Sequence, residues 1–239
     1  MGAFSYYILG NDQRDAALAC VARAMMKEPS VHSLKKFVYL DLIEMVEFWM
    51  DECSSNNLSV FAFNEEDHRI AGVLLVRDFN FFPKSFGETY SHESKALTPV
   101  VQNIGALDEE AIKIFPQLNE GGLGTVADLW LLTVHPDYRG NRIANLLMGY
   151  ALPLIKNAGF KHSTIEATSY FTSKVAEYHG FKALCSKNVK EILWKGERIF
   201  EHIKPPHGEW IYWIRNMKEV NSKDFDPQDK KNILKHSKL

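Results

Sequence analysis

One segment constrains the fold of this chain more than any other: residues 125–157 hold an apolar run, a short turn and a helix-forming run. Residues 125–134 are the most strand-like stretch of the sequence. They lead through His135-Pro136-Asp137 into a predicted helix from about Gly140 to Asn157. The first N–H groups of such a helix have no intrahelical partner, and the helix dipole is positive at that end. This unit therefore suits the binding of a pyrophosphate.

The turn itself is rich in small and positively charged residues. It contains Arg139, Gly140, Asn141, Arg142, Ile143 and Ala144. Glycine and alanine allow a backbone to approach a phosphate closely, and the arginines add positive charge. The sequence has neither the GxxxxGK[ST] pattern of a P-loop nor a GxGxxG pattern after an early strand. An ordinary strand–turn–helix with solvated arginines is the alternative explanation of this segment taken alone.

The rest of the chain alternates strand-like and helix-like segments without an internal repeat. Further strands are predicted at residues 4–9, 58–64, 69–77, 162–168, 189–194 and 209–215. Further helices are predicted at residues 12–27, 39–53, 108–118 and 171–179, the third of them capped by Asp108. This order predicts an α/β (α+β) domain with a mixed central sheet of about seven strands flanked by helices. We expect the domain to span residues 1–217 and the polar, lysine-rich residues 218–239 to form a poorly ordered tail.

Composition and charge give no reason to expect several classes of partner, and we expect a cytoplasmic protein. A formal net charge of -2 gives no electrostatic reason to expect nucleic acid or an anionic membrane as partner. The amino terminus does not resemble a secretory signal, and no run is long and apolar enough to span a membrane. The three cysteines are widely spaced, which is typical of reduced thiols, and the histidines lack metal-site spacing. We expect no metal and a monomer or homodimer.

Residues 127–184 resemble the GCN5-related N-acetyltransferases along their whole length. The family's coenzyme motif, Q/R-x-x-G-x-G/A, is matched by residues 139–144, with Arg142 where the family prefers glycine. A second block, residues 165–181, is similar to the family's next strand and helix and ends in its Gly-Phe pair. The Glu28-Pro29 pair and the segments RGNRIA, ATSYFTSK and HGF are most similar to the arylalkylamine and dopamine N-acetyltransferase branch.

This resemblance implies that the protein binds acetyl-CoA and transfers its acetyl group to a primary amine without an acyl-enzyme intermediate. In the family, backbone N–H groups of the strand before the coenzyme loop contact the thioester carbonyl and the pantetheine. Those positions correspond to Leu132, Thr133 and Val134, with the Val134 amide facing the developing oxyanion. The motif residues 139–144 would hold the pyrophosphate, and Ser169 and Lys174 would also contact the coenzyme. Plain core packing is the alternative for the side chains of Leu132 and Val134.

Two carboxylates are candidates for accepting the proton of the amine. Glu28 matches the glutamate that acts as base in the arylalkylamine branch, although a loop carboxylate at a helix end explains it equally well. Asp128 lies within a strand, where alternation places it on the same face as Trp130, Leu132 and Val134. It would serve as a second base or as the buried partner of an arginine, and we favour the arginine partner.

The group that protonates the departing thiolate is harder to identify. Many family members have a tyrosine four residues before the Gly-Phe pair, and this chain has Ala176 there. Tyr178 lies on a different face of the helix and does not replace that tyrosine. The hydroxyls of Thr172 and Ser173 match those used in the arylalkylamine branch, although each is also explained as a hydroxyl at a helix start.

The acceptor is predicted to be a small arylalkylamine or a polyamine-like amine. The aromatic residues in segment 79–90 would suit a pocket for an aromatic amine, or they would seal the edge of the sheet, which we favour. Two alternatives stay open. A non-catalytic acyl-CoA-binding sensor would explain Ala176 and Arg142, and a protein or peptide N-acetyltransferase would need an open groove.

Overall fold

A computed structural model describes residues 4–34, 38–81 and 97–220 of the chain. It contains a seven-stranded sheet with the order β1-β2-β3-β4-β5-β7-β6, in which the only parallel pair of neighbours is β4–β5. The strands are β1 (Phe4–Ile8), β2 (Val60–Asn64), β3 (Arg69–Asp78), β4 (Val126–Val134), β5 (His162–Ala167), β6 (Lys182–Asn188) and β7 (Glu209–Asn216). The predicted mixed sheet of about seven strands is therefore confirmed.

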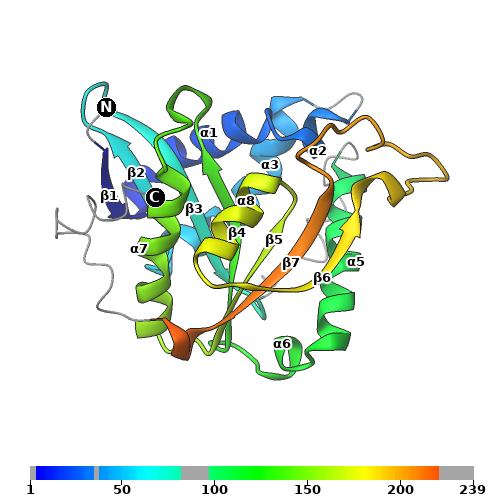
Figure 1. Ribbon diagram of the computed structural model, residues 1–239. Coiled ribbons are helices and arrows are strands. Elements are labelled where there is room, and N and C mark those ends of the chain that lie inside the picture. The colour runs from blue at the N-terminus through cyan, green and yellow to red at the C-terminus, as the bar shows by residue number, and fades with distance from the viewer. Residues whose placement is uncertain (1–3, 35–37, 82–96, 221–239) are drawn as a thin grey trace.

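Helices cover both faces of this sheet (Figure 1). They are α1 (Arg14–Met25), α2 (Pro29–His32), α3 (Tyr39–Ser55), α5 (Thr98–Ile114), α6 (Gln117–Glu120), α7 (Ile143–Asn157) and α8 (Tyr170–Tyr178). Short 3-10 turns occur at Asn11–Gln13, Pro136–Tyr138, Val189–Glu191 and Met217–Glu219. Helices α7 and α8 lie on the face turned to the viewer in Figure 1, whereas α1 and α3 lie behind β2, β3 and β4.

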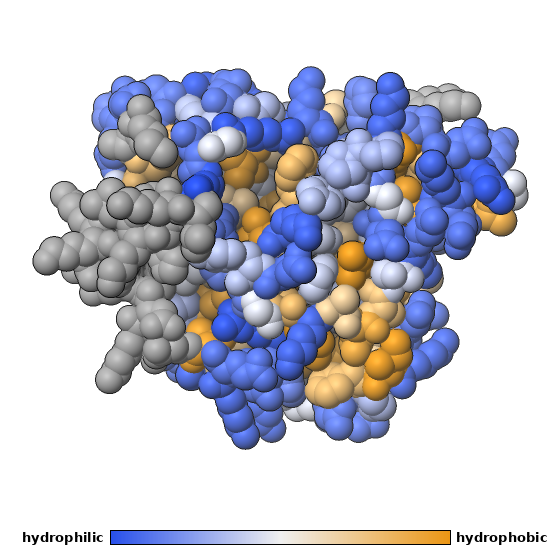
Figure 2. Space-filling view, viewed as in Figure 1, coloured by the Kyte–Doolittle hydropathy of each residue, from blue (hydrophilic) through white to orange (hydrophobic). Residues whose placement is uncertain are grey.

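Three clusters of buried side chains hold these layers together. The first joins α7 and α8 to the sheet through residues such as Leu147 and Ala176. The second joins α1 and α3 to the opposite face, and the third joins α5 to β7 through Leu107 and Tyr212. Hydrophilic residues dominate the visible surface in Figure 2, and hydrophobic residues reach it in small areas, the widest of them at the lower right. The apolar residues thus lie mainly between the layers, as hydrophobic burial requires.

A β-bulge in β4 changes which side chains share a face. Between Leu75↔Leu131 and Arg77↔Asp128 the register shifts, because β4 has one residue more than β3 over this interval. Trp130 and Leu131 consequently both pack toward α1 and α3, and Leu132 packs toward α7. The expectation that Asp128 shares a face with Leu132 and Val134 is therefore wrong, although it does share one with Trp130. A bulge inserts one residue and reverses the alternation beyond it.

Two element predictions need correction for other reasons. The sixth strand is Lys182–Asn188 and not the predicted segment 189–194. That segment begins with a 3-10 turn, Val189–Glu191, and its Val189 and Ile192 are buried beside α5. Strand β6 lies at the sheet edge and pairs only with β7, so it needs few apolar residues and gives a weak sequence signal. Helix α5 begins at Thr98, ten residues before the predicted start. Asp108 is therefore inside this helix and does not cap it.

The chain stays in contact with the core beyond the expected domain end at residue 217. The Met217 amide N–H donates to the Lys161 carbonyl, and the buried Val220 packs against α7 and its neighbours. Residues 221–239 of the expected tail lie outside the described residues. In the parts of the chain that the structure describes, no helix has the length and apolarity needed to cross a membrane. The cytoplasmic location and the monomer or homodimer stay predictions.

Candidate active site

The predicted phosphate turn lies between β4 and α7 and has an unusual backbone. Gly140 has a φ of +86° and Arg142 a φ of +58°, both in the left-handed region that favours glycine. The Asn141 side-chain amide donates to the Tyr138 carbonyl at 3.0 Å, which ties the turn to the preceding 3-10 segment. A methyl group added at Gly140 would meet no atom within 4 Å, so this side of the turn is open. The turn therefore fits an approaching pyrophosphate.

The helix after this turn begins later than predicted, at Ile143 rather than near Gly140. Arg142 is its N-cap residue, and its side chain makes no capping hydrogen bond. The N–H groups of Ile143 and Ala144 are thus the first of the helix, where α-helices have no internal acceptor for them. The left-handed φ of Arg142 is a backbone conformation that glycine adopts more readily than other residues do. Arginine adopts that conformation at a cost of about 1–2 kcal/mol.

The backbone of β4 presents two amides to the gap between β4 and β5. The His135 N–H donates to the Ala71 carbonyl on β3, so by antiparallel alternation Thr133 also points its N–H to β3. The N–H groups of Leu132 and Val134 then point the opposite way, toward β5. The pairing between β4 and β5 runs from Val126↔His162 to Asp128↔Thr164, and the strands separate beyond it (Figure 1). Leu132 and Val134, but not Thr133, therefore offer amides at this gap.

Glu28 lies between α1 and α2, where Pro29 begins the second helix. One of its carboxylate oxygens, Oε2, is buried and has no hydrogen-bond partner among the described residues. Burial raises the pKa of Glu28, and the positive charge of Arg139 partly opposes this shift. The Arg139 guanidinium also donates to the Ala24 carbonyl at 3.4 Å, which brings the phosphate turn next to the end of α1. Glu28 thus combines a free oxygen, an elevated pKa and proximity to the turn.

Glu28 lines a cavity of about 350 Å³ on the face of the sheet that α1, α3 and α5 cover. This volume lies within the range of small-molecule sites. Four aromatic side chains contribute to its wall, and they are Trp49, Phe79, Phe81 and Trp130. Phe79 and Phe81 come from the predicted aromatic segment, whereas Phe82, Phe86 and Tyr90 lie outside the described residues. Two of these aromatic residues therefore line a cavity, which supports the pocket alternative for this part of the segment.

Asp128 is the buried partner of an arginine, which was the favoured alternative. Its Oδ2 accepts a hydrogen bond from Arg77 Nε at 2.7 Å, and its side chain is 1% exposed. The Arg77 guanidinium lies 4.2 Å from the ring centre of Trp49 and 5.2 Å from that of Trp130. Asp128 is not among the residues that line the cavity, whereas Arg77 and Trp130 are. Its placement favours a positioning role through Arg77.

Thr168, which directly precedes the N-cap residue of α8, lines the same cavity. Ser169 is the N-cap of α8, and its Oγ accepts from the Thr172 N–H at 3.2 Å and lies 3.0 Å from Thr172 Oγ1. The Ser173 hydroxyl is buried and accepts from Trp213 Nε1 at 3.4 Å. Lys174 is exposed and pairs with Glu177 at 2.7 Å. Both candidate hydroxyls thus have structural partners, and their chemical roles stay predictions.

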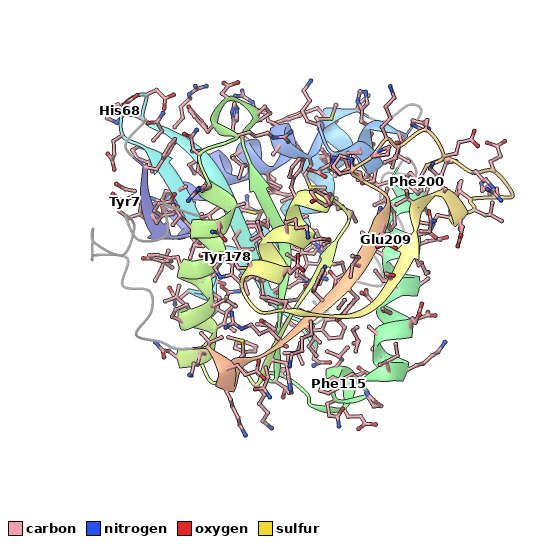
Figure 3. All side chains as sticks on the ribbon, in the orientation of Figure 1. Tyr7, His68, Phe115, Tyr178, Phe200 and Glu209 are labelled. Carbon is pink, nitrogen blue, oxygen red and sulfur yellow. The ribbon has the colours of Figure 1, made fainter. Side chains whose placement is uncertain are left out.

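The position of the missing family tyrosine is closed to solvent. Ala176 is 0% exposed and packs in the core under α7 and α8. Tyr178, labelled in Figure 3, is 44% exposed on the outer side of α8. His179 ends the helix as predicted, and its Nε2 lies 3.0 Å from the Asn145 carbonyl oxygen. Within the part of the chain that the structure describes, no group of three or more His, Cys, Asp or Glu residues is placed to hold a metal ion.

Three charged residues were not placed in the cavity wall from the sequence, and these are Arg77, Asp108 and Glu166. Glu166 lies on β5 between Ile165 and Ala167, both buried. An acid inside an apolar strand was the signal used for Asp128, and the same signal would have identified Glu166. The sequence predicts Asp108 as a helix cap because proline and glycine, which are unfavourable in helices, precede it within α5.

A second, more open hollow of about 550 Å³ lies beside the β2–β3 hairpin. Tyr7 and His68, labelled in Figure 3, are among its lining residues, together with Cys20 and His135. It contains none of the predicted site residues. The cavity beside Glu28 is therefore the candidate acceptor site.

Comparison with known proteins gives a fold but no sequence family. No family model matches the sequence, and no curated protein matches it. Among solved structures, arylalkylamine N-acetyltransferase 2 from Aedes aegypti has a TM-score of 0.70 at 20% identity, covering 90% of this chain and 99% of that one. The C-terminal condensation domain of Ebony, in complex with beta-alanyl-dopamine, has a TM-score of 0.75 at 16% identity, covering 90% of this chain and all of that one.

Polyamine N-acetyltransferase from Drosophila melanogaster has a TM-score of 0.68 at 13% identity, with 90% of this chain and all of that one covered. These similarities establish the fold of the chain, which is that of the GCN5-related N-acetyltransferases. Solved structures with this fold include arylalkylamine and polyamine N-acetyltransferases as well as a condensation domain. Because the same fold supports different chemistries, the activity must be argued from the site.

Proposed function

We propose that this protein is an acetyl-CoA-dependent N-acetyltransferase whose acceptor is a small arylalkylamine or polyamine-like primary amine. One observation carries the proposal: the unpartnered Glu28 oxygen lines a cavity of small-molecule size and lies next to the phosphate turn. Two of the solved neighbours described above are named as arylalkylamine or polyamine N-acetyltransferases, which supports an amine acceptor. The cofactor fits because the turn is open at Gly140 and leads into the free N–H groups of α7.

The coenzyme and the acceptor would approach the gap between β4 and β5 from opposite sides. The turn at residues 139–144 would hold the pyrophosphate, with Ser169 and Lys174 at the start of α8 as further contacts. The Leu132 amide would bind the pantetheine, and the Val134 amide would stabilise the oxyanion. Backbone donors suit this role because they are fixed before the reaction begins.

In the reaction, the amine nitrogen attacks the thioester carbonyl, so that a C–N bond forms and the C–S bond breaks. Glu28 would accept the proton that the amine loses, directly or through a water molecule. An alkylammonium has a pKa of about 10, so a carboxylate with a raised pKa is a better-matched base than an ordinary one. The thiolate would take a proton from Thr172 or Ser173, or from solvent.

The experiment compares the wild type with Glu28→Gln in acetyl-CoA thiol release across a panel of primary amines. We expect kcat/KM to fall by about 10²–10⁴-fold while acetyl-CoA binding is unchanged. Glu44→Gln is the matched control, because Glu44 is an exposed carboxylate on α3. Equal activity of wild type and Glu28→Gln would reject Glu28 as the base.

A non-catalytic acyl-CoA sensor is the second candidate, and two observations favour it. Ala176 removes the tyrosine that many related enzymes have, and Arg142 strains the phosphate turn. Coenzyme binding without turnover of any amine or peptide would establish the sensor and reject the enzyme. Turnover of peptides alone would instead identify a peptide N-acetyltransferase.

A further inference from the structure

The cavity beside Glu28 has two chemically different ends. The groups that shift the pKa of Glu28 are burial and Arg139, which belongs to the phosphate turn. Asp108 and Glu166 line the same cavity, and their pKa values respond to burial and then to a different set of charges, Asp128 and Arg77 among them. Glu28 and the other two carboxylates thus line one cavity but have different charged neighbours. The cavity thus holds a candidate base beside Arg139 of the phosphate turn and an acidic pair beside Arg77.

The fold brings the acidic pair together from distant parts of the sequence. Glu166 lies on β5, in register with Tyr212 of β7, and Asp128 lies on β4, in register with Thr164 of β5. Helix α5 crosses this face of the sheet and places Asp108 over it. Carboxylates from two strands and one helix thus meet on one face.

Too little positive charge is present to balance these carboxylates. Asp108, Asp128 and Glu166 share the neighbourhood of one guanidinium, that of Arg77, whose Nε donates to Asp128. Each of the three keeps one oxygen that is buried and has no hydrogen-bond partner among the described residues. Asp128 is the deepest of them, because its side chain is 1% exposed. A buried acceptor without a donor is costly, and a bound cation would supply both donors and charge.

The aromatic walls of the cavity also suit a cation. The faces of Trp49 and Trp130 already attract the Arg77 guanidinium at 4.2 and 5.2 Å. Phe79 adds a further ring to the lining. Aromatic faces attract cations, and the methylene groups between two charges would pack well on such walls.

We propose that Asp108 and Glu166 bind a second cationic group of the acceptor, so that the preferred acceptor is a diamine or a similar dication. This inference rests on the proposed function. The reacting amine would lie at Glu28, and the far ammonium or guanidinium group would donate hydrogen bonds to the free oxygens of Asp108 and Glu166. A monoamine of equal length would leave those oxygens unpartnered. Asp128 and Arg77 hold the acidic pair in place and are positioning residues.

The test compares cadaverine with pentylamine, which has the same five-carbon chain but a hydrogen atom in place of the second ammonium group. Isothermal titration calorimetry measures binding of each amine to the full chain, and thiol release from acetyl-CoA measures turnover. We expect cadaverine to have a kcat/KM at least about tenfold higher than pentylamine, mainly through KM, because charge-assisted hydrogen bonds are lost. An equal kcat/KM for the two amines would overturn the inference.

The variants Asp108→Asn and Glu166→Gln remove the charges and keep the side-chain shapes. We expect each to lower the cadaverine preference over pentylamine several-fold, and the double variant to abolish that preference. Glu109→Gln is the matched control, since Glu109 is an exposed neighbour of Asp108 on α5. Thermal melts of each variant would test whether it is folded. Retention of the full preference by the double variant would overturn the assignment of these two residues.

The two readouts separate this inference from the proposed function. If acetyl-CoA binds and no amine is turned over, the enzyme is rejected, and calorimetry still decides the second subsite. Cadaverine binding that the double variant loses would then support a dication site in a non-catalytic protein. Turnover of pentylamine with no preference for cadaverine would support the enzyme and reject the dication site.

Discussion

The phosphate turn and the acceptor cavity are built on opposite principles. The turn uses consecutive residues, 139–144, and acts mainly through backbone N–H groups at the start of α7. The cavity uses side chains from α3, α5, β3, β4 and β5 and the segment after α1. A local backbone site depends little on side-chain identity, which explains how Arg142 is accommodated. A site of distant, buried charges depends on every partner, so substitutions there should have the larger effects.

The largest effect on stability is expected when the cavity loses its guanidinium. Arg77→Met leaves Asp128 buried without a cation and should lower the free energy of unfolding by about 3–5 kcal/mol. Urea denaturation at about pH 8 measures this loss. At about pH 5 the loss should be smaller, because burial raises the pKa of Asp128 and it takes up a proton more readily.

A double variant provides the control for this prediction. Arg77→Met/Asp128→Leu removes both charges and should regain most of the lost stability. If the single variant were as stable as the wild type at both pH values, the cavity would be no more sensitive than the turn, and the contrast between the two regions would fail.

The second effect concerns pH and arises from the same cavity. Burial, followed by the charge of Asp128, raises the pKa of Asp108 to about 7. Its folded pKa is thus above its unfolded value of about 4, so the folded state binds more protons between these values. The contribution of the Asp108 carboxyl to the free energy of unfolding is therefore fully present below about pH 4 and is lost as the pH rises through about 7.

The Asp108→Asn variant should therefore show a flatter dependence of the melting temperature on pH than the wild type. At about pH 8 it should be the more stable protein, by at least about 1 kcal/mol. Glu109→Gln, which changes an exposed carboxylate, should follow the wild type. An unchanged slope in Asp108→Asn would show that this carboxyl is not responsible.

The smallest effect is expected in the phosphate turn. Arg142→Gly relieves a left-handed backbone at φ +58° and should stabilise the protein by about 0.5–1 kcal/mol. Acetyl-CoA affinity should stay within a few-fold of the wild type, because the N–H groups of the turn are retained. Calorimetry and thermal melts measure both quantities.

Lys195→Gly is the control, since Lys195 has a φ of +50° in a loop outside the site. It should give a similar gain in stability and no change in acetyl-CoA affinity. A large loss of affinity in Arg142→Gly would show that the arginine side chain wraps the phosphates, and the turn would then depend on side chains as the cavity does.

The sequence by itself determined the mixed sheet, the strand–turn–helix unit and the similarity to N-acetyltransferases. These features depend on residues close together in the chain, such as the apolar run of β4 followed by Gly140, and periodicity reports local structure directly. The end of the first helix at the Glu28-Pro29 pair was also predictable from sequence, because proline disfavours helical geometry in the residue before it. Strand β6 was misplaced because an edge strand needs little apolar patterning.

Only the tertiary structure decided which residues surround the acceptor. The extra residue in β4 moves Leu132 and Val134 to the face opposite Asp128, and no periodicity in the sequence reveals a bulge. Arg77, Asp108 and Glu166 are separated by many residues and meet because β3 and β5 are strands of one sheet and α5 packs on the face where their side chains lie. That packing brings the carboxylates together and leaves some of their oxygens without a hydrogen-bond partner among the described residues. These oxygens are the physical basis for expecting a second cation in the acceptor.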